Sequence, residues 1–210
     1  MRNPMRILRR QRERTPRQAA RTVVLDQDGS VFLLRSDNVE VGVHWTSPGG
    51  GIEPGESPFE GARRELWEET GWTDLAPGPL LCTWEHDFTW HGIPVRQHEH
   101  IFLTVGPHRG PVGDVSSVHA TDGILDWRWW TTADLADERA DAFWPPQLPS
   151  LLADVRAKGW PGGGAPGSLP AFEPVDLGYV ANGAGSSSGS TDATKGTAEP
   201  ADSSREVTDA

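Results

Sequence analysis

Cysteine is almost absent from this chain of 210 residues. Because Cys82 is the one cysteine, no internal disulfide can form, and a reducing compartment is expected. Long apolar runs are missing as well, since none approaches the ~18 residues that a membrane span requires. The N-terminus lacks the apolar region of a secretory signal. These absences predict a cytoplasmic protein with no membrane partner.

Positive charge is scarce outside the first residues. The formal net charge is −11, yet residues 1–21 contain eight arginines against one acid, Glu13, which leaves −18 on the rest of the chain. So acidic a body disfavours broad nucleic-acid binding and suits a protein that recruits cations.

Composition divides the chain into three parts. Residues 1–16 are basic and aperiodic, residues 17–158 carry the apolar periodicity of one domain, and residues 159–210 are rich in Gly, Pro, Ser and Ala. The two outer parts bury too little apolar surface to offset their ordering entropy, so both are predicted to be disordered. One island in the C-terminal tail, LPAFEPVDLGYV at 169–180, leaves docking on the domain open.

Inside the domain, hairpin signals alternate with helical ones. Two apolar segments, RTVVL and VFLLR, flank the turn pair Asp28-Gly29 and predict a β-hairpin, and His91-Gly92 predicts a second turn. Further strands are expected near 80–84, 85–90, 93–95, 101–105 and 126–130, and further helices from 132 and over 149–158. This order predicts an α/β fold in which helices pack on a mixed sheet.

The clearest helix lies between Ser57 and Gly71. Ser57 is the expected N-cap, Pro58 occupies the first helical position, and Glu60 completes a capping box. Gly71 stands where a left-handed C-terminal cap is expected. A core-facing stripe at spacings i, i+3 and i+7 is predicted for Phe59, Ala62 and Leu66.

Three glutamates occupy the last two turns of this helix. Glu65, Glu68 and Glu69 fall within ~100° of one another, where the macrodipole disfavours anions by ~0.3–1 kcal/mol each. At ~5 Å and an effective dielectric of ~20, each like-charged pair repels by ~3 kcal/mol before solvent and salt reduce it. One interpretation is an acidic, solvent-facing surface. The other is a site for a divalent cation, because carboxylate oxygens are hard ligands that suit Mg²⁺ or Mn²⁺.

The helix is entered from a glycine-rich loop, SPGGG at 47–51. Its glycines allow left-handed dihedrals and the close approach of a ligand. Its carbonyl groups can add ligands to the same cation. This context favours the cation site over the solvent-facing surface.

The whole stretch resembles the Nudix box in full. The matching pattern is Gly50, five residues, Glu56, seven residues, Arg64-Glu65-Leu66, one residue, Glu68-Glu69, one residue and Gly71-Trp72. Seven fixed positions at roughly 6% background frequency each give on the order of 10⁻⁹ per starting point, so chance is no competitor. Trp72 is bulkier than the aliphatic residue that usually closes the box. The flanking hairpin, HWTSPGGG and LDWRWWTTADL also look like Nudix-domain features.

The resemblance implies an α/β/α sandwich that hydrolyses a nucleoside diphosphate linked to another group, with Mg²⁺ or Mn²⁺ as cofactor. By motif position, Glu65, Glu68 and Glu69 would bind the metal, and the Gly49 carbonyl would assist. Metal-activated water would attack one phosphorus in line and displace the other phosphate. The catalytic set would be Glu65, Glu69 and Arg64, with Arg64 orienting a glutamate. The general base stays open between Glu65 and a residue outside the box.

Other positions of the box would support this chemistry. Gly50 and Gly51 would let the substrate approach and bind, Glu56 would belong to the scaffold, and Gly71 would end the helix.

Outside the box, the candidates rest on weaker signals. Glu99 shares the inward face of RQHEHIFLTV with Ile101 and Leu103. A charged residue on that face suggests an extra metal ligand or base, and the alternative is a strand-entry residue still in solvent. Arg35 and Arg96 are candidates for binding phosphate, against a surface role.

Aromatic residues, histidines and one more glutamate complete the list of candidates. Trp45, beside the glycine loop, is a candidate for stacking on a nucleobase, against packing in the core. Glu138, in a polar segment, is a candidate for a mobile base. His98 and His100 are interpreted as paired surface histidines rather than metal ligands.

Three functions compete. The leading one is a metal-dependent diphosphate hydrolase acting on a small-molecule nucleotide. The second is a Nudix module that binds a nucleotide without cleaving it, and the complete glutamate set argues against it. The third is an RNA 5′-end pyrophosphohydrolase whose Arg-rich start binds phosphates, although an unstructured extension is the simpler interpretation of that start. Loops outside the box choose the substrate, here 37–43, 91–92 and 106–123.

Overall fold

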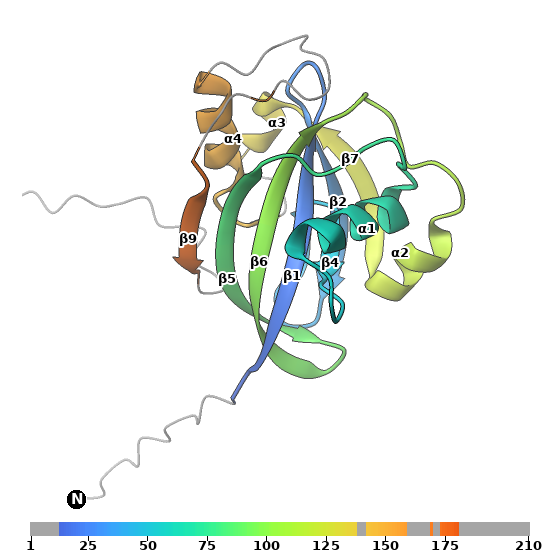
Figure 1. Ribbon diagram of the computed structural model, residues 1–210, viewed down its shortest axis with the longest axis vertical. Helices are drawn as coiled ribbons and strands as arrows, with labels where there is room; N and C mark the ends of the chain where they lie inside the picture. The colour runs from blue at the N-terminus through green and yellow to red at the C-terminus, as the bar shows by residue number, and fades with distance from the viewer. Residues whose placement is uncertain (1–12, 138–141, 159–168, 170–172, 181–210) are drawn as a thin grey trace, which may run out of the picture.

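The computed structural model describes residues 13–137, 142–158, 169 and 173–180 (Figure 1). In chain order, the elements of this part are β1 (Thr15–Leu25), β2 (Val31–Asn38), β3 (Gly42–Thr46), β4 (Gly49–Gly51), α1 (Pro58–Thr70), β5 (Leu80–Trp90), β6 (Ile93–Val105), α2 (Ser116–Asp122), β7 (Ile124–Trp130), α3 (Thr132–Leu135), β8 (Ala142–Trp144), α4 (Leu148–Ala157) and β9 (Val175–Tyr179).

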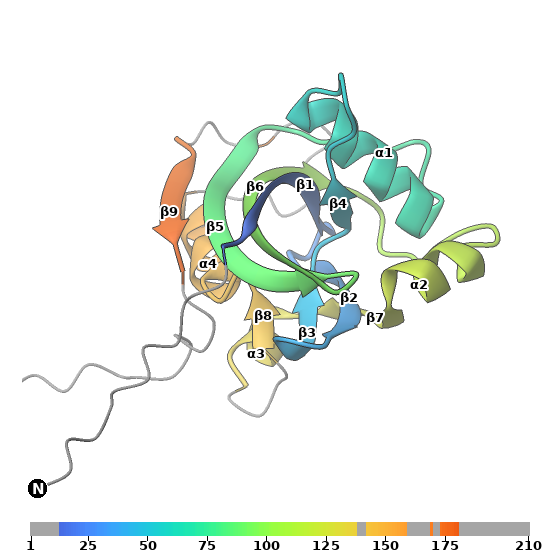
Figure 2. The same ribbon diagram turned by 90° about the horizontal axis from the view of Figure 1, so that it is seen from below.

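The strands form one mixed sheet, as predicted. Its order is β8-β3-β2-β1-β6-β5-β9, with β4 paired to β1 and β7 paired to β2. The pairs β1–β6, β3–β8 and β5–β9 are parallel, and the other pairs are antiparallel. Seen from below, the sheet is strongly curved (Figure 2).

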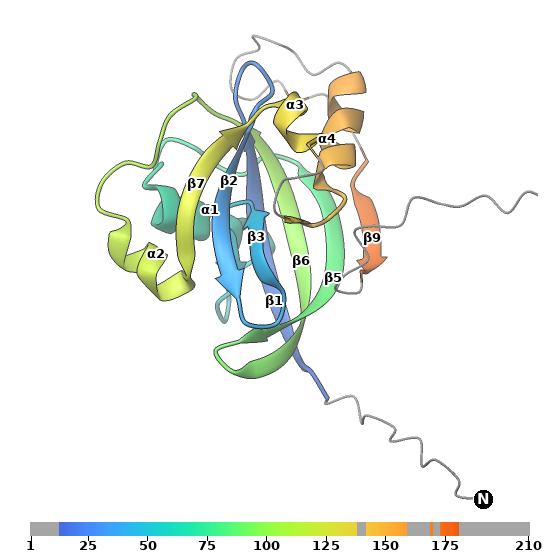
Figure 3. The same ribbon diagram turned by 180° about the vertical axis from the view of Figure 1, so that it is seen from behind.

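Helices cover both faces of the sheet, so the α/β/α sandwich is confirmed. Strand alternation places Val23 and Leu25 in the core beneath α3 and α4, whereas Val24 joins Leu66 and Trp72 beneath α1. Figure 1 shows α1 in front of β1 and β4, and Figure 3 shows α3 and α4 on the opposite face. Two apolar cores hold the three layers together.

The sheet opens where β1 and β2 part. These strands pair only next to their turn, through Val24–Phe32 and Leu25–Val31. Nearer its start, β1 pairs with β4 on the side that β2 leaves, and β6 pairs with the other side of β1 along its whole length. Strand β2 pairs with β7 and, towards its end, with β3. The divergence leaves room for a cavity between the two groups of strands.

Helix α1 has the predicted ends. The Ser57 hydroxyl accepts from the Glu60 amide, the capping box is complete, and Gly71 is left-handed at φ 70° with its amide on the Trp67 carbonyl. The prediction for Phe59 is wrong, because its side chain is 39% exposed and lies edge-on against Phe102 at the outside of the sheet. The stripe that enters the core is Ala62 and Leu66, both fully buried.

Several elements are longer or more numerous than predicted. The expected strands at 80–84 and 85–90 are one strand, β5, and those at 93–95 and 101–105 both belong to β6. The turn between them is His91-Gly92, with φ values of 45° and 80°. Strands β3, β4 and β8 and helix α2 were not predicted. None of the helices in the described part of the chain is long and apolar enough to cross a membrane.

The island at 169–180 lies against the domain where the structure describes it. Strand β9 pairs in parallel with β5 at the edge of the sheet, and Leu169, Leu177 and Val180 pack against the core beneath α4. At the other end, β1 begins at Thr15, two residues before the predicted start of the domain.

Candidate active site

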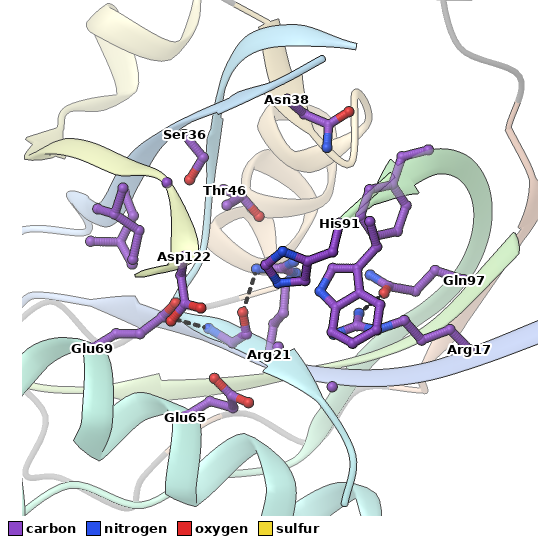
Figure 4. A pocket seen from close by; sticks show the side chains of 18 of the residues that line it. Arg17, Arg21, Ser36, Asn38, Thr46, Glu65, Glu69, His91, Gln97 and Asp122 are labelled. Atoms are coloured by element: carbon purple, nitrogen blue, oxygen red, sulfur yellow. Dashed lines mark hydrogen bonds between the residues drawn. The ribbon is translucent and has the colours of Figure 1, made fainter. Parts of the chain in front are cut away.

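A cavity of about 790 Å³ lies where the sheet opens. Strands β1 and β4 and helix α1 form one wall, and β2, β3 and the end of α2 form the other. The hairpin of β5 and β6 and the Trp144 end of β8 close the far end. Figure 4 shows Glu65, Glu69 and Asp122 together at one side of this cavity and Arg17 and Gln97 at the other.

Two of the three helix glutamates are turned into the cavity. Glu69 is 5% exposed, and its Oε2 accepts a hydrogen bond of 2.7 Å from the Gly49 amide. The Glu65 side chain is 12% exposed and faces the Gly50 backbone. Glu68, at 44% exposed, stays at the rim. The helical spacing thus produces a graded set of carboxylates, from buried to exposed.

Burial makes the inner carboxylates hard to ionise. Burial raises the pKa of Glu65, and it raises the pKa of Glu69 well above its ordinary range, with the neighbouring charge of Glu65 acting in the same direction. The Arg21 guanidinium partly opposes both effects. An acidic pair of this kind is a favourable place for a cation.

Arg64 is the hub of the outer half of the site. Its guanidinium donates to Glu56 at 2.8 and 3.1 Å, to Glu65 at 2.8 Å, to Glu68 at 3.0 Å and to the Gly51 carbonyl at 2.8 Å. These bonds, the one to Glu56 foremost, raise the pKa of Arg64. The guanidinium of Arg64 therefore connects α1 to β4. This agrees with the orienting role that the resemblance implies for Arg64 and with the scaffold role that it implies for Glu56.

The three glycines of β4 leave space that any side chain would fill. Gly49 adopts φ 149°, and a Cβ there would collide with the Ala20 carbonyl and the Arg21 side chain. A Cβ on Gly50 would lie 2.7 Å from both Glu65 oxygens, and one on Gly51 would lie 2.6 Å from Arg17 Nη2. The run of glycine is thus required by what packs against it.

The chemical type of the donor atoms fits a hard divalent cation. Glu65, Glu68, Glu69 and the Gly49 carbonyl offer only oxygen, the preference of Mg²⁺ and Mn²⁺. Across the described residues, no three carboxylate, imidazole or thiolate side chains converge on one point in this conformation. Because Arg64 holds Glu65 and Glu68, these two carboxylates must rotate to complete a coordination shell with Glu69, whose Oε2 accepts from the Gly49 amide.

Glu99 lies on the inward face, as predicted, but it does not reach the cavity. It is 1% exposed, and each oxygen accepts two bonds: Oε2 from Arg21 Nε and Trp84 Nε1, and Oε1 from His86 Nε2 and Gln97 Nε2. Burial alone would raise the pKa of Glu99, but Arg21 and His86 lower it below its ordinary value. A carboxylate that accepts four hydrogen bonds and lies outside the cavity lining is placed neither as a base nor as a free ligand, which corrects the expectation.

Arg35 and Arg96 lie outside the cavity lining. On β2, Leu34 and Ser36 line the cavity, and strand alternation directs Arg35 to the opposite face. Arg96 forms a two-bond pair with Asp87, at 2.9 and 3.1 Å, on the outer face of the sheet. Both positions correct the expectation of phosphate binding.

Trp45 is not placed to stack on a nucleobase, because it is 6% exposed and packs edge-on against Trp130 in the core. The alternative interpretation of Trp45, packing in the core, agrees with its position. His98 and His100 face each other on β6 with ring centres 4.9 Å apart, and His98 lies 3.4 Å from Glu85. Glu138 falls outside the described residues.

Several cavity residues were missed by the sequence analysis. Arg17 and Arg21 project from β1, Asp122 from the end of α2, and Gln97 from β6, and His91 lies over the cavity (Figure 4). The four-residue spacing of Arg17 and Arg21 puts both on one face of a strand, but in the sequence they follow directly on the arginines of the basic N-terminus, which hides this signal. Nothing in the sequence around Asp122 singled it out.

A carboxylate-bearing helix set against a glycine strand at the mouth of an opened mixed sheet defines a hydrolase of the Nudix type. The sequence profile described as NUDIX domain matches residues 15–151. The chain belongs to the Nudix hydrolase family.

Its relatives agree with this assignment. An uncharacterized Nudix hydrolase, orf19, of Rhodococcus erythropolis is 33% identical over 148 residues, which cover 65% of this chain and 75% of that protein. An RNA pyrophosphohydrolase of Erythrobacter litoralis is 34% identical over 125 residues, or 54% and 74% of the two chains. The crystal structure of a MutT protein from Methanosarcina mazei shares the fold, with a TM-score of 0.50 at 19% identity over 68% of this chain and 94% of that one.

Proposed function

We propose that this enzyme hydrolyses the diphosphate linkage of a nucleoside diphosphate joined to another group, with Mg²⁺ or Mn²⁺ as cofactor. The observation that carries the proposal is a pair of carboxylates, the buried Glu69 and the half-buried Glu65, which face a wall of glycine backbone in a cavity of nucleotide size. Two acids at the end of a helix repel each other, and Arg64 and Arg21 offset their charge only in part, so their retention favours a ligand that offsets them further.

Residues of α1 and β4 would bind the metal, position the carboxylates and supply the general base. Glu65, Glu68, Glu69 and the Gly49 carbonyl would hold the metal, which when bound neutralises the diphosphate and lowers the pKa of water. Arg64 keeps Glu65 and Glu68 on the cavity side of α1. We assign the general base to Glu65, because its carboxylate faces the cavity and burial raises its pKa above its ordinary value.

The opposite end of the cavity suits the nucleoside. Phe88, Trp90 and Trp144 line it, so a planar base can stack there. Arg17 lies over the Trp90 ring at 4.9 Å, and no carboxylate in the described part of the chain forms an ion pair with it. Burial and the nearby Arg21 charge lower its pKa. Arg17 is therefore placed to receive a phosphate between the aromatic end and the glutamates.

A nucleotide panel with Mn²⁺ or Mg²⁺ tests the proposal. Wild type should release mononucleotide and phosphate products from at least one member, and Glu69→Gln should lower kcat by roughly 100-fold or more, because it removes a charged metal ligand. Glu85→Gln, which changes an exposed carboxylate on β5, is the matched control and should keep full activity. Turnover by Glu69→Gln at the wild-type rate would refute the metal-site assignment.

RNA 5′-end pyrophosphohydrolysis is the second candidate. It is favoured by the similarity to the RNA pyrophosphohydrolase of Erythrobacter litoralis. A short 5′-triphosphorylated RNA should then be cleaved faster than any free nucleotide, and deleting residues 1–12 should slow only the RNA reaction if the arginines there bind the strand. The deletion stops before Arg14, because that residue pairs with Glu40 and Asp87 of the domain.

A further inference from the structure

Arg21 is a partly buried cation that joins three strands of the site, β1, β4 and β6. Its side chain is 14% exposed, and its Nε donates to Glu99 Oε2 at 2.9 Å. Its Nη1 donates to the Ser47 carbonyl at 3.0 Å and to the Gly49 carbonyl at 2.8 Å. A single side chain of β1 thus connects the floor of the sheet at β6 with the glycine strand.

The far end of this connection is fixed. Glu99 is held by Trp84, His86 and Gln97 in addition to Arg21, so the carboxylate has one orientation and a full set of donors. The Arg21 guanidinium is consequently held in place by a group that cannot rotate. Arginine suits this role, because its planar fork can address a carboxylate and two carbonyls at once.

The near end of the connection is the peptide of Gly49. The Gly49 amide donates to Glu69 and its carbonyl accepts from Arg21, so both polar groups of this residue are bound from opposite elements. The β1 backbone adds a bond from the Thr22 amide to the Pro48 carbonyl at 2.8 Å. The missing Cβ of Gly49 is what admits the Arg21 side chain beside its backbone.

The charge of Arg21 is balanced by Glu99. The other carboxylates that act on Arg21 are Glu69 and Glu65. Without the charge of Glu99, the guanidinium would be attracted to these two acids and would compete with a dication for them. Glu99 therefore keeps the guanidinium of Arg21 at the floor of the site and away from the carboxylates of Glu69 and Glu65.

We propose that Arg21 and Glu99 are a positioning pair for the metal site: Glu99 anchors Arg21, and Arg21 fixes the Gly49 peptide against Glu69. This role rests on the proposed function for the identity of the ligand, but the geometry of the loop can be measured without it. Neither residue touches the reacting atoms.

Mn²⁺ binding and hydrogen exchange test the pair together. Glu99→Gln preserves the shape of the side chain and removes its charge, and Arg21→Lys preserves the charge of residue 21 and removes the fork. Both variants should weaken Mn²⁺ binding, followed by electron paramagnetic resonance, by about 10- to 100-fold, as loss of an outer-shell partner does. Both should also speed amide exchange in peptides covering 47–51.

A matched control separates positioning from general stability. Arg96→Met breaks an arginine–carboxylate pair on the same strand as Glu99, but on the outer face. It should leave Mn²⁺ affinity and exchange over 47–51 unchanged, whatever it does to the melting temperature. Wild-type Mn²⁺ affinity and wild-type exchange in folded Arg21→Lys would overturn the proposal, even if Glu99→Gln fails to fold. If wild type itself binds no Mn²⁺, the proposed function fails, and the exchange rates alone decide the positioning role.

Discussion

The three glycines of β4 allow one methyl group to be placed in three different surroundings. Alanine at position 49 meets backbone, at position 50 it meets the Glu65 carboxylate, and at position 51 it meets the Arg17 guanidinium. The three substitutions are chemically identical and adjacent in sequence. We predict that they fail in three different ways.

Gly49→Ala should damage the fold. Its Cβ would overlap the Ala20 carbonyl, which cannot move without breaking the pairing of β1, and overpacking of this kind costs about 1–3 kcal/mol. The φ of 149° adds about 1–3 kcal/mol of backbone strain for alanine. A domain of this size loses about 2–4 °C of melting temperature per kcal/mol, so we expect a fall of roughly 10 °C.

Gly50→Ala should spare the fold and damage the chemistry. The new Cβ would lie 2.7 Å from both Glu65 oxygens, so the carboxylate must retreat by about 0.7 Å to reach ordinary contact. Because the atoms that move are the end of a long side chain, stability should change by less than about 1 kcal/mol. Misplacing a reacting group by this distance should lower kcat by about 10- to 100-fold.

Gly51→Ala should act on substrate binding instead. Its Cβ would lie 2.6 Å from Arg17 Nη2, which must move away from the cavity wall. A charge-assisted bond is worth about 1.5–3 kcal/mol, so the KM should rise by about 10-fold or more with kcat little changed.

Thermal unfolding, Mn²⁺ binding and steady-state kinetics distinguish the three outcomes. Gly50→Ala should weaken Mn²⁺ binding, and Gly51→Ala should not. The reasoning fails if Gly49→Ala melts with wild type, or if Gly50→Ala keeps both wild-type kcat and wild-type Mn²⁺ affinity.

Three further predictions concern stability. Burial lowers the pKa of His44 to about 4, whereas His44 of the unfolded chain takes up a proton below about pH 6.5, so the free energy of unfolding falls as the pH drops from 6.5 towards 4. His44→Phe removes this titration and should reduce the fall in unfolding free energy between pH 7 and pH 5, measured by urea unfolding, by about 2 kcal/mol. Trp72 is 1% exposed and donates to the Gly110 carbonyl at 3.0 Å. Trp72→Leu should therefore lower the free energy of unfolding by roughly 2–4 kcal/mol, even though aliphatic residues usually close the box, and an unchanged melting temperature would contradict this. Leu177→Ala should cost about 1–2 kcal/mol, because Leu177 packs on the core from β9, whereas Val175→Ala, on an exposed residue of the same strand, should cost almost nothing.

Local signals predicted the part of the fold that local chemistry decides. The N-cap, capping box and C-cap of α1 depend on side chains within a few residues, and the structure has all three. The first hairpin follows in the same way from its turn residues. Strand β4 escaped prediction because glycine has low strand propensity and pairs here only through its backbone with β1. Helix α2 escaped because none of its residues is buried, so no apolar stripe marks it.

The same distinction between local and long-range interactions separates the site residues that the sequence predicts correctly from those that it does not. The motif placed Glu65, Glu69 and Arg64 because one helix carries all three, and their relative positions follow from its spacing. The errors concern residues whose surroundings are set by distant strands. Glu99 faces inward as strand alternation requires, but only the pairing of β5 with β6 brings His86 and Trp84 to it and removes it from catalysis.

The opening of the sheet explains why the motif alone leaves the substrate undecided. The Nudix box contributes most of β4 and all of α1, which supply the helix carboxylates and, together with β1, one wall of the cavity. The facing wall comes from β2 and β3, and the aromatic end comes from β5 and β8, all outside the box. A change of Phe88, Trp90 or Trp144 would therefore alter what fits in the cavity without moving the carboxylates of α1. The chemistry and the choice of substrate can change separately, because the helix carboxylates lie on α1, whereas the residues that line the facing wall and the aromatic end lie on β2, β3, β5 and β8.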